Sequence, residues 1–572
     1  MEPSLEKLRH STAHLLAAAI LELYPKTKLA IGPAIEDGFY YDFDALSIKE
    51  EDLPKIQEKM QELIKKNIKF EKTEKSQAEA KKLLKDQPYK LELLKEIKQP
   101  SFYRSGNFID LCSGPHVQSS SEIKAFKLTR LAGAYWRGDS KNKMLTRIYG
   151  VAFSSKKELD DYLKQQEEIE KRNHIKLGKE LGIFMISDLV GKGLPIWLPK
   201  GNIIKEEIEK LAKEKEAEYG YVRVTTPNLA KKELFIKSGH LPYYKDSMYP
   251  EMKMDDGSYY LKAMNCPHHH LIFKHQLRSY RELPLRIAEY GMCYRNELSG
   301  TLAGLLRVRA MSMNDAHIYC TKDQIESEFS QIVKLVEEYY KIFNLKDYWF
   351  RLSLWGPKNK EKYIQEPENW KYSEEILRNA LKKLKVKFVE ADDEAAFYGP
   401  KVDIQFKSAS GREETMSTIQ LDFAAKKRFE LSYQDKEGKE NKDVFVIHRA
   451  PLSTHERFTA FLIEHYLGHF PLWLSPVQVK IVTVNDSCID FAEQVEKQLK
   501  FAGVRVELDS RAESIGKKVR DAETEKVPII VTIGEKEVQK KALAVREQGK
   551  VNFDVLIDTF LKETKERIEK RC

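Results

Sequence analysis

The chain has 572 residues, of which 42% are hydrophobic and 32% charged, so it can bury several cores and is too apolar for general disorder. Its 97 Lys and Arg against 88 Asp and Glu leave a formal charge of +9, which permits a polyanionic partner without requiring one. At ~150 residues per domain, this length predicts three or four domains.

The sequence also excludes several classes of protein. The first thirty residues carry charged side chains and no apolar signal core, and no run approaches the ~18 apolar residues of a membrane span. The six cysteines are dispersed without a CxxC pair, which is typical of a reducing cytoplasm rather than of a disulfide scaffold. We therefore expect a cytoplasmic multidomain protein.

Residues 1–154 are expected to form a mixed α/β domain. Apolar residues at helical spacing predict a helix over 5–23, and an aromatic run flanked by glycines predicts a strand over 39–43. The Lys/Glu-rich stretch 48–97 indicates a solvated helical layer, after which FYRSGNFIDLCSGPHV returns to a strand and turn pattern.

A charged helical linker over 155–182 is expected next, with one helix over 156–179 opened by a capping box in which Glu158 follows Ser155 by three residues. Residues 183–474 form the largest region and hold most of the histidines. From 475 to 572, short apolar strands alternate with charged helices, which predicts a small α/β domain. Its strands are expected at 479–484, 504–508 and 527–533.

The first candidate site combines His10 and His14 with Cys112 and His116. Residues four apart share a helix face, so the two histidines of HSTAH can enter one pocket, and CSGPH can bring two more nitrogen or sulfur groups to it. Ser11 stands where the HExxH motif of metalloproteases has its glutamate. The spacing leaves open a tetrahedral zinc site, a metal-free hydrolytic pocket, and a purely structural role.

The second candidate is a set of dispersed metal ligands, Cys266, His317 and His448. Catalytic zinc sites draw three ligands from separate elements and leave a fourth position open, although each of these residues taken singly is more often a satisfied core residue. The run 268–270 of three histidines indicates packing, because adjacent side chains diverge.

The third candidate is a set of arginines suited to phosphate. Arg295 and Glu297 follow a strand-like segment, Arg307 and Arg309 follow a glycine-containing loop, and Arg457 lies at the start of an apolar helix. Arginine forks hold phosphate oxygens bidentately, and the alternative is a set of ordinary surface ion pairs.

Taken in order, these motifs resemble the threonyl-tRNA synthetase family of class II aminoacyl-tRNA synthetases over essentially the whole chain. The resemblance implies an α/β multidomain (α+β) protein: an N-terminal α+β editing domain, a class II core built on an antiparallel sheet, and a C-terminal α/β anticodon-binding domain. Members usually begin with a further small N-terminal domain, whereas this sequence begins at the editing domain. The motifs that carry the resemblance are HSTAH, FYYDFD, DLCSGPH, YWRGDSKNKMLTRIYG, KAMNCPHH, YRNELSG, RVR, NDAHIYC, FYGPKVD, IQLDF, VIHRA and ERF.

The resemblance also implies the reaction and its partners. Threonine and ATP, with Mg²⁺, give threonyl-adenylate, and the threonyl group then passes to the 3′ end of threonine tRNA. A homodimer is implied, formed through a long helix and a strand ending near Pro227. Neither DNA nor a membrane is implied as a partner.

Individual site residues follow from the resemblance by position. Arg295 and Arg457 would be the catalytic arginines at the α- and γ-phosphates of ATP, with Glu297 and Arg307 also at the nucleotide. One zinc ion per chain would be held by Cys266, His317 and His448, and would bind the amine and hydroxyl of threonine. The threonine pocket would add Asp315, Tyr398 and Gln420, the editing pocket His10, His14, Tyr41, Lys90, Asp110, Cys112 and His116, and the anticodon site Glu537 and Arg546.

A zinc site and a separate editing site together explain how threonine could be selected over valine and serine. An apolar pocket separates valine from threonine only ~10²-fold, whereas a metal that requires the hydroxyl rejects valine much more strongly. Serine keeps the hydroxyl and lacks one methyl, worth only ~1–3 kcal/mol, so a second, hydrolytic site must clear seryl-tRNA. The resemblance implies that editing proceeds through water without a bound metal.

The sequence departs from the family pattern at several positions. Met311 stands where an aromatic residue usually stacks on adenine, and Met313 where a glutamine is usual. Other departures are Ser453, Thr454 and His455 before the ERF motif, His268 in place of a glycine, and Ala512 in place of an asparagine. The aromatic residue lost at 311 and the absent N-terminal domain of the family keep open a non-catalytic paralogue that binds tRNA or mRNA. The motifs HSTAH and CSGPH keep open a third interpretation, a hydrolase that acts mainly through them.

Overall fold

The computed structural model describes residues 4–139, 141–359, 361–408, 411 and 413–571. The chain divides into two compact units, Met1–Glu167 and Glu168–Cys572, each described by itself below. Among the described residues, no helix is both long enough and apolar enough to cross a bilayer.

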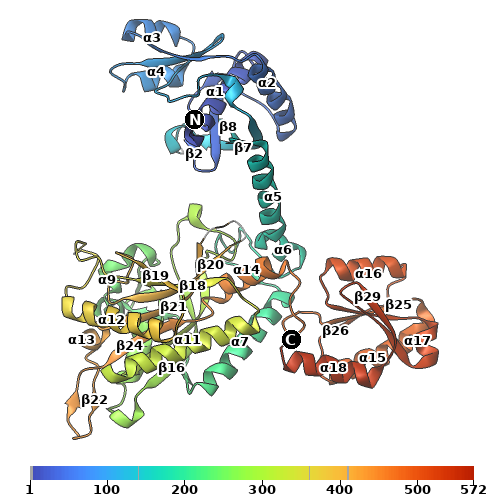
Figure 1. The fold of residues 1–572 in the computed structure, drawn as a ribbon. Helices are drawn as coiled ribbons and strands as arrows, with labels where there is room; N and C mark the ends of the chain where they lie inside the picture. The colour runs from blue at the N-terminus through green and yellow to red at the C-terminus, as the bar shows by residue number, and fades with distance from the viewer. Residues whose placement is uncertain (1–3, 140, 360, 409–410, 412, 572) are drawn as a thin grey trace. The chain divides into compact units, whose positions relative to one another are not determined.

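The N-terminal unit is built around helix α1 (Leu5–Leu23), which has the predicted bounds (Figure 1). One long face of α1 is buried against strands β3 and β8 and against helix α2, and its apolar residues join theirs in one core. The sheet under α1 has the strand order β1-β3-β8-β7, with β2 paired to β3. The bounds are β1 (Lys28–Leu29), β2 (Ala34–Ile35), β3 (Gly38–Asp44), α2 (Leu53–Lys65), β7 (Ala125–Tyr135) and β8 (Met144–Phe153).

A second, three-stranded antiparallel sheet, β4-β5-β6, completes this unit. Strand β4 corrects the prediction of an all-helical layer over 48–97, because its residues Phe70–Glu74 pair with β5. Only Phe70 of β4 is buried, so its alternation signal is too weak to separate it from the charged helices around it. The remaining bounds are α3 (Gln77–Leu83), α4 (Pro88–Leu94), β5 (Ser101–Ser105) and β6 (Phe108–Leu111).

The predicted linker helix is two helices, α5 (Lys156–Arg172) and α6 (His174–Glu180). The break falls at Asn173, whose side chain accepts hydrogen bonds from the backbone N–H groups of Ile175 and Lys176. Asparagine is a strong N-cap residue, and its non-helical backbone here ends one helix and starts the next. The prediction of a single helix over 156–179 was therefore wrong at this residue.

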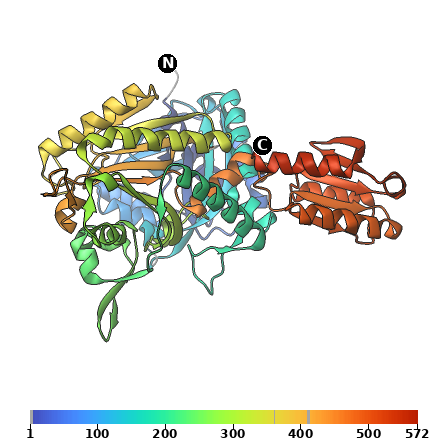
Figure 2. The ribbon, with the colours of Figure 1, turned by 90° about the horizontal axis from the view of Figure 1, so that it is seen from below.

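The second unit is built on an eight-stranded sheet with the order β11-β16-β17-β24-β21-β20-β18-β19. All neighbouring pairs are antiparallel except β11 with β16 and β18 with β19. Helices α11 and α12 lie side by side over one face of the sheet in both views (Figures 1 and 2). The bounds are β11 (Val222–Arg223), β16 (Leu285–Tyr294), β17 (Ala310–Cys320), α11 (Ile325–Ile342), β18 (Tyr348–Ser353), α12 (Pro367–Lys383), β19 (Phe388–Ala391), β20 (Lys401–Lys407), β21 (Glu413–Asp422) and β24 (Phe445–Ala450).

The two faces of this sheet have different residues because side chains alternate along a strand. On β17, Ala316, Ile318 and Cys320 join the core with α11, whereas Asp315 and His317 point to the opposite face. Helix α10 (Cys266–Lys274) covers that opposite face, where Phe273 stacks on Tyr319. The sheet thus keeps one face for packing and the other for polar groups.

Smaller elements surround this sheet. Helix α7, which precedes β11, carries the buried residues Ile204, Ile208 and Leu211 of the main core. Helix α14 follows β24, and its N-cap Thr454 accepts a hydrogen bond from the backbone N–H of Arg457. The bounds are β9 (Phe184–Met185), β10 (Ile196–Trp197), α7 (Pro199–Glu218), β12 (Leu229–Lys231), α8 (Lys232–Lys237), α9 (His240–Tyr243), β13 (Met252–Met254), β14 (Gly257–Leu261), β15 (Arg278–Ser279), α13 (Ala425–Phe429), β22 (Tyr433–Gln434), β23 (Glu440–Asn441) and α14 (His455–Tyr466).

The C-terminal part of this unit is a five-stranded sheet of order β26-β25-β27-β28-β29. Its first three strands are parallel, as expected for strands alternating with helices, and all three overlap the predicted segments. Strands β28 and β29 add an antiparallel hairpin. The bounds are β25 (Val479–Thr483), α15 (Ile489–Phe501), β26 (Val506–Asp509), α16 (Ile515–Thr524), β27 (Ile529–Ile533), α17 (Glu535–Lys540), β28 (Ala542–Glu547), β29 (Lys550–Leu556) and α18 (Ile557–Glu569).

Candidate active site and editing pocket

A row of polar side chains crosses three neighbouring strands on the face that α10 covers. His317 on β17 is directly opposite His448 on β24, which is opposite Gln420 on β21. Directly opposed residues in antiparallel strands have their side chains on one face and close together. The strand pairing therefore brings these three residues together, although His317 and His448 are more than 100 positions apart in the sequence.

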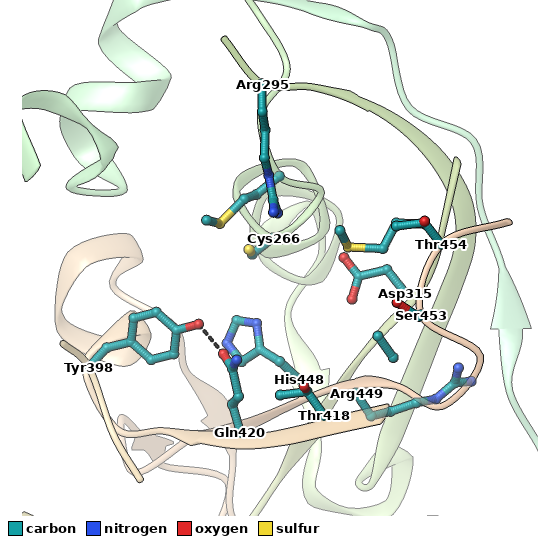
Figure 3. A pocket seen from close by; sticks show the side chains of 13 residues that line it. Cys266, Arg295, Asp315, Tyr398, Thr418, Gln420, His448, Arg449, Ser453 and Thr454 are labelled. Carbon is teal, nitrogen blue, oxygen red and sulfur yellow. Dashed lines mark hydrogen bonds between the residues drawn. The ribbon is translucent and has the colours of Figure 1, made fainter. Parts of the chain in front are cut away.

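His448 and Gln420 of this row line a cavity of about 240 Å³ (Figure 3). The figure shows side chains entering it from the sheet, from the start of α10 and from the segment after β16. The lining residues include Cys266, Arg295, Met313, Asp315, Tyr398, Gln420, His448, Arg449 and Ser453.

Cys266, His317 and His448 could hold a metal ion. One ligand atom from each lies within 4.8 Å of the others, although their sequence positions are far apart. His317 is fully buried, and its Nε2 has no hydrogen-bond partner among the described residues. One thiol and two imidazoles form a donor set that suits zinc, and the unpartnered nitrogen is an atom that a metal would satisfy. These residues therefore fit a zinc ion.

Two buried aspartates flank these ligands. His448 Nε2 lies 3.1 Å from Asp422 Oδ2, and this contact lowers the pKa of Asp422 even though burial opposes ionisation. Asp315 accepts a hydrogen bond of 3.1 Å from the Asn265 amide, and burial raises its pKa above the ordinary aspartate value. A carboxylate at this position can accept a hydrogen bond from a substrate hydroxyl.

Tyr398 and Gln420 face the same cavity, and the Tyr398 hydroxyl donates a hydrogen bond to the Gln420 side-chain oxygen (Figure 3). The Tyr398 ring also stacks on His448, with 5.4 Å between ring centroids. The three residues that the resemblance assigns to threonine, Asp315 being the third, thus line one cavity.

The predicted phosphate-binding residues are spread more widely. Arg295 lines the cavity, and Glu297 accepts hydrogen bonds of 2.9 Å from Arg307, which is 54% exposed. Arg457 lies on α14 and donates a hydrogen bond of 3.0 Å to Glu414 of β21. In the described residues, therefore, both later arginines are already paired with carboxylates.

Met311 and Met313, the two methionines that depart from the family pattern, lie on the same face of β17 as Asp315 and His317. Positions 311, 313, 315 and 317 alternate along the strand with the residues that enter the core. Met311 is buried in a small cluster with Cys293 and Val308. Met313 is half-buried and lines the cavity.

The N-terminal unit holds a second polar cluster that includes both predicted motifs. His10 and His14 come from one face of α1, and Cys112 Sγ lies 3.3 Å from His10 Nε2 and 3.4 Å from His116 Nε2. The four ligand atoms lie within 4.8 Å of one another. Burial lowers the pKa of all three histidines and raises that of Cys112 to about 11, so neutral imidazoles and a thiol are the stable forms here.

Asp110 on β6 links this cluster to two other predicted editing residues. Its carboxylate accepts hydrogen bonds of 2.6 Å from the Tyr41 hydroxyl and of 2.8 Å from Lys90, and it lies 3.9 Å from His14. Lys90 is only 4% exposed, so this is a buried ion pair. A cavity of about 450 Å³ is lined by His10, His14, Lys90, Asp110 and Cys112 among others.

The two predicted anticodon residues, Arg546 on β28 and Glu537 on α17, lie at opposite ends of strand β27. Arg546 on β28 pairs with Ile530 and lines a cavity of about 580 Å³ with Glu523, Lys526 and Arg567. Glu537 lies beyond the other end of β27, where its carboxylate accepts a hydrogen bond from the backbone N–H of Gly534. The structure does not bring Arg546 and Glu537 together.

Sequence reasoning missed several residues that orient the sites. Ser11 Oγ lies 3.0 Å from His116 Nδ1 and accepts a hydrogen bond from the Val117 backbone N–H, and Asp422 contacts His448. Ser11 lies between the two histidines of HSTAH, so a search for hydroxyls beside ring nitrogens could have found it. Asp422 follows Gln420 by two residues on β21 and therefore shares its face.

Three family models match this chain. The tRNA synthetase class II core domain (G, H, P, S and T) matches residues 249–466, and the anticodon binding domain matches 478–567. The threonyl and alanyl tRNA synthetase second additional domain matches 101–149. Together with the antiparallel sheet and its cavity, these matches define a class II aminoacyl-tRNA synthetase.

Similar proteins narrow the class. The threonine–tRNA ligase of Oceanobacillus iheyensis is 49% identical over 99% of this chain and 89% of its own length. That of Geobacillus kaustophilus is 49% identical over 98% of this chain and 87% of its own. A solved RNA-binding domain of threonyl-tRNA synthetase from Cryptosporidium parvum, 33% identical, covers 69% of this chain and 98% of its own with a TM-score of 0.65.

The chain belongs to the threonine–tRNA ligase family. It is an enzyme that activates threonine with ATP, as the magnesium complex, and transfers it to tRNA, and it carries the editing domain of that family. The predicted fold class is confirmed by the same matches.

Proposed function

We propose that the 240 Å³ cavity is the site of threonine activation and that the residues lining it divide the work. Asp315 accepts a hydrogen bond from the threonine hydroxyl, and Tyr398 and Gln420 close the pocket around the side chain. Arg295 holds the α-phosphate and Arg457 the γ-phosphate of ATP, with Glu297 and Arg307 at the nucleotide. Fixed guanidinium groups stabilise the charge that develops on the phosphates. The observation that carries this proposal is the single cavity shared by Arg295, Asp315, Tyr398 and Gln420.

The proposal includes one zinc ion, held by Cys266, His317 and His448. The support is the proximity of the three ligand atoms and the unpartnered, buried Nε2 of His317. When bound, the ion supplies a Lewis acid that coordinates the amine and hydroxyl of threonine. For this role Asp422 keeps the His448 ring oriented.

The N-terminal pocket is the site proposed to hydrolyse seryl-tRNA. His10, His14 and Cys112 line it, with His116 beside them in the same cluster, as neutral donors and acceptors that can position a water molecule. Asp110, held by Tyr41 and Lys90, places a carboxylate 3.9 Å from His14.

Recognition of tRNA is proposed to use Arg546 and Glu537 in the C-terminal domain. The basic residues around the 580 Å³ cavity support a contact with RNA at Arg546, whereas Glu537 would need a different nucleotide. Domain limits of 1–154, 155–182, 183–474 and 475–572 are proposed for the editing, linker, catalytic and anticodon-binding segments. The dispersed cysteines support a cytoplasmic location.

The test is threonine-dependent exchange between ATP and pyrophosphate, measured on protein whose zinc has been counted, with valine and serine alongside. The proposal expects exchange with threonine, weak exchange with serine and none with valine, at about one zinc per chain. Exchange with valine comparable to that with threonine would overturn the metal's proposed role. No exchange in zinc-loaded protein would overturn the proposed activation site and favour the alternative of an RNA-binding paralogue.

A further inference from the structure

Three buried side chains form a hydrogen-bonded line that ends on His317. Glu289 on β16 lies 3.2 Å from His269 Nε2, and His269 Nδ1 on α10 lies 2.7 Å from His317 Nδ1 on β17. Both histidines are fully buried and Glu289 is 3% exposed, so water does not compete for these contacts. None of the three is shared with the cavity lining described above.

The order of donors along this line is fixed by what each group can do. A neutral imidazole has one N–H donor and one acceptor nitrogen, and a carboxylate only accepts. Glu289 already accepts from the backbone N–H and the hydroxyl of Thr226, at 2.7 and 2.9 Å, so it is a carboxylate facing donors. His269 therefore donates from Nε2 to Glu289, which leaves its Nδ1 as an acceptor.

This order of donors determines which ring nitrogen of His317 carries the proton. Two Nδ1 atoms at 2.7 Å share one proton, and since His269 Nδ1 accepts, His317 Nδ1 must donate. His317 Nε2 is then the nitrogen with the lone pair, and it is the same buried atom that has no partner among the described residues.

We propose that Glu289 and His269 are positioning residues: acting through His269, Glu289 selects the tautomer of His317 that presents a lone pair to zinc. This inference rests on the proposed zinc site. Asp422 does the same for His448 directly, through Nε2, so each histidine ligand has one carboxylate that sets its tautomer. The difference is that the Glu289 effect passes through a second imidazole.

The same line continues at its other end, beyond Glu289 and away from the proposed metal site. Lys262, fully buried, donates a hydrogen bond of 2.8 Å to the Thr226 hydroxyl and lies 3.9 Å from Glu289. The carboxylate is thus anchored at both oxygens by groups from separate segments, 226 and 262, and cannot rotate away from His269 without losing these donors.

The test is the zinc affinity of the full chain, measured by competition with a chromophoric chelator. In Glu289→Gln, the new amide can donate to His269 Nε2 and reverse the tautomers along the line, so zinc should bind ~10–100-fold more weakly. His269→Leu removes the acceptor and should weaken zinc binding by a similar factor. His268→Gln, the adjacent buried residue on α10, is the matched control and should keep wild-type affinity.

A rescue variant separates this role from simple packing. In His269→Asn, the amide oxygen can occupy the place of Nδ1 and accept from His317, so zinc affinity should stay within a few-fold of wild type. Adding Glu289→Gln to His269→Asn should then cause no further loss, because the carboxylate acts only through the imidazole.

The outcomes are distinct. Weaker zinc binding in Glu289→Gln that disappears in the His269→Asn background supports the relay. Wild-type zinc affinity in both Glu289→Gln and His269→Leu, or an equal loss from Glu289→Gln in either background, overturns it while leaving the zinc site in place. A wild-type protein that binds no zinc overturns the metal site itself, and the relay with it.

Discussion

Cys112 lies within hydrogen-bond distance of two imidazoles, and burial raises the pKa of its thiol to about 11. At neutral pH the group is therefore a thiol and a poor nucleophile, because the thiolate is the reactive form. This favours a role in holding a water molecule or the substrate over covalent attack.

Cys112→Ala should leave threonylation of tRNA unchanged and allow seryl-tRNA to accumulate. The editing pocket and the activation cavity are built from different residues, so losing one thiol removes a contact only in the editing pocket. Aminoacylation assays with threonine and with serine would measure this. Loss of threonylation together with hydrolysis would instead favour the hydrolase alternative.

Arg295→Ala should lower threonine-dependent ATP–pyrophosphate exchange by ~10²–10³-fold, the usual effect of removing one group that stabilises a transition-state charge. Arg295 is the one predicted phosphate-binding arginine that lines the described cavity. Arg281→Ala, an exposed arginine on the same unit, is the control. Near-normal exchange in Arg295→Ala would contradict the assignment.

Glu456, next to Arg457 on α14, should make the stability of the protein depend on pH. Burial raises its pKa from 4.5 to about 7, so the folded state holds a proton that the unfolded state releases. Its contribution to the free energy of unfolding is fully present below about pH 4.5 and is lost as pH rises through 7, by at most about 3 kcal/mol.

Thermal unfolding measured between pH 5 and 8 would check this. Glu456→Gln is neutral at every pH and should show a smaller fall in melting temperature than wild type over that range. Parallel curves for the two proteins would show that Glu456 does not carry the proton.

For individual residues, the sequence identified candidate site residues but not how they are arranged in space. His10 and His14 could be paired from helical spacing alone. Cys266, His317 and His448 could be named as a candidate set, but no spacing rule could show that they meet, because strand pairing brings them together. Asp422 lies within the IQLDF motif but contacts His448 rather than the cavity, and Glu289 contacts only His269 of the proposed relay, so their roles follow from the structure rather than from a motif.

Among elements, β16 and the start of α10 come unusually close. A methyl group on Gly291 of β16 would lie 2.1 Å from Asn265 Oδ1, and Asn265 is fully buried and donates to Asp315. Glycine at position 291 therefore leaves the room that Asn265 needs to donate its hydrogen bond to Asp315.

Gly291→Ala should raise the KM for threonine by roughly 5- to 150-fold, because overpacking of this kind costs about 1–3 kcal/mol and displaces Asn265. Exchange measured against threonine concentration would report it. Gly516→Ala, where no described atom lies within 4 Å of the new methyl, is the control. An unchanged KM would show that Asn265 can shift without disturbing Asp315.

Elements with strong periodicity were predicted well, and those with weak signals were not. Helix α1 has its predicted bounds because its apolar face is continuous, and β25, β26 and β27 overlap their predicted segments. Strand β4 and the break at Asn173 escaped prediction, because one buried residue or one capping side chain decided each of them.

For the whole molecule, we predict a dimer in solution with twice the 66.6-kDa mass of the chain. Strand β11 is an edge of the large sheet, Val222 on it is 49% exposed, and the long helix α7 precedes it directly. An edge strand with an exposed apolar residue is suited to a partner copy. Light scattering coupled to size exclusion would measure the mass, and a stable 66.6-kDa species at micromolar concentration would contradict the prediction.

The row His317–His448–Gln420 constrains how this enzyme can evolve. Inserting or deleting one residue in β17, β24 or β21 would turn its functional side chain into the core and expose core residues in the site. Substitutions can be tested by selection one at a time, whereas a length change in one of these strands would displace a side chain of the proposed activation site and disturb sheet packing in one event. Lineages of such proteins should therefore diverge in length at loops and keep these three strands uninterrupted.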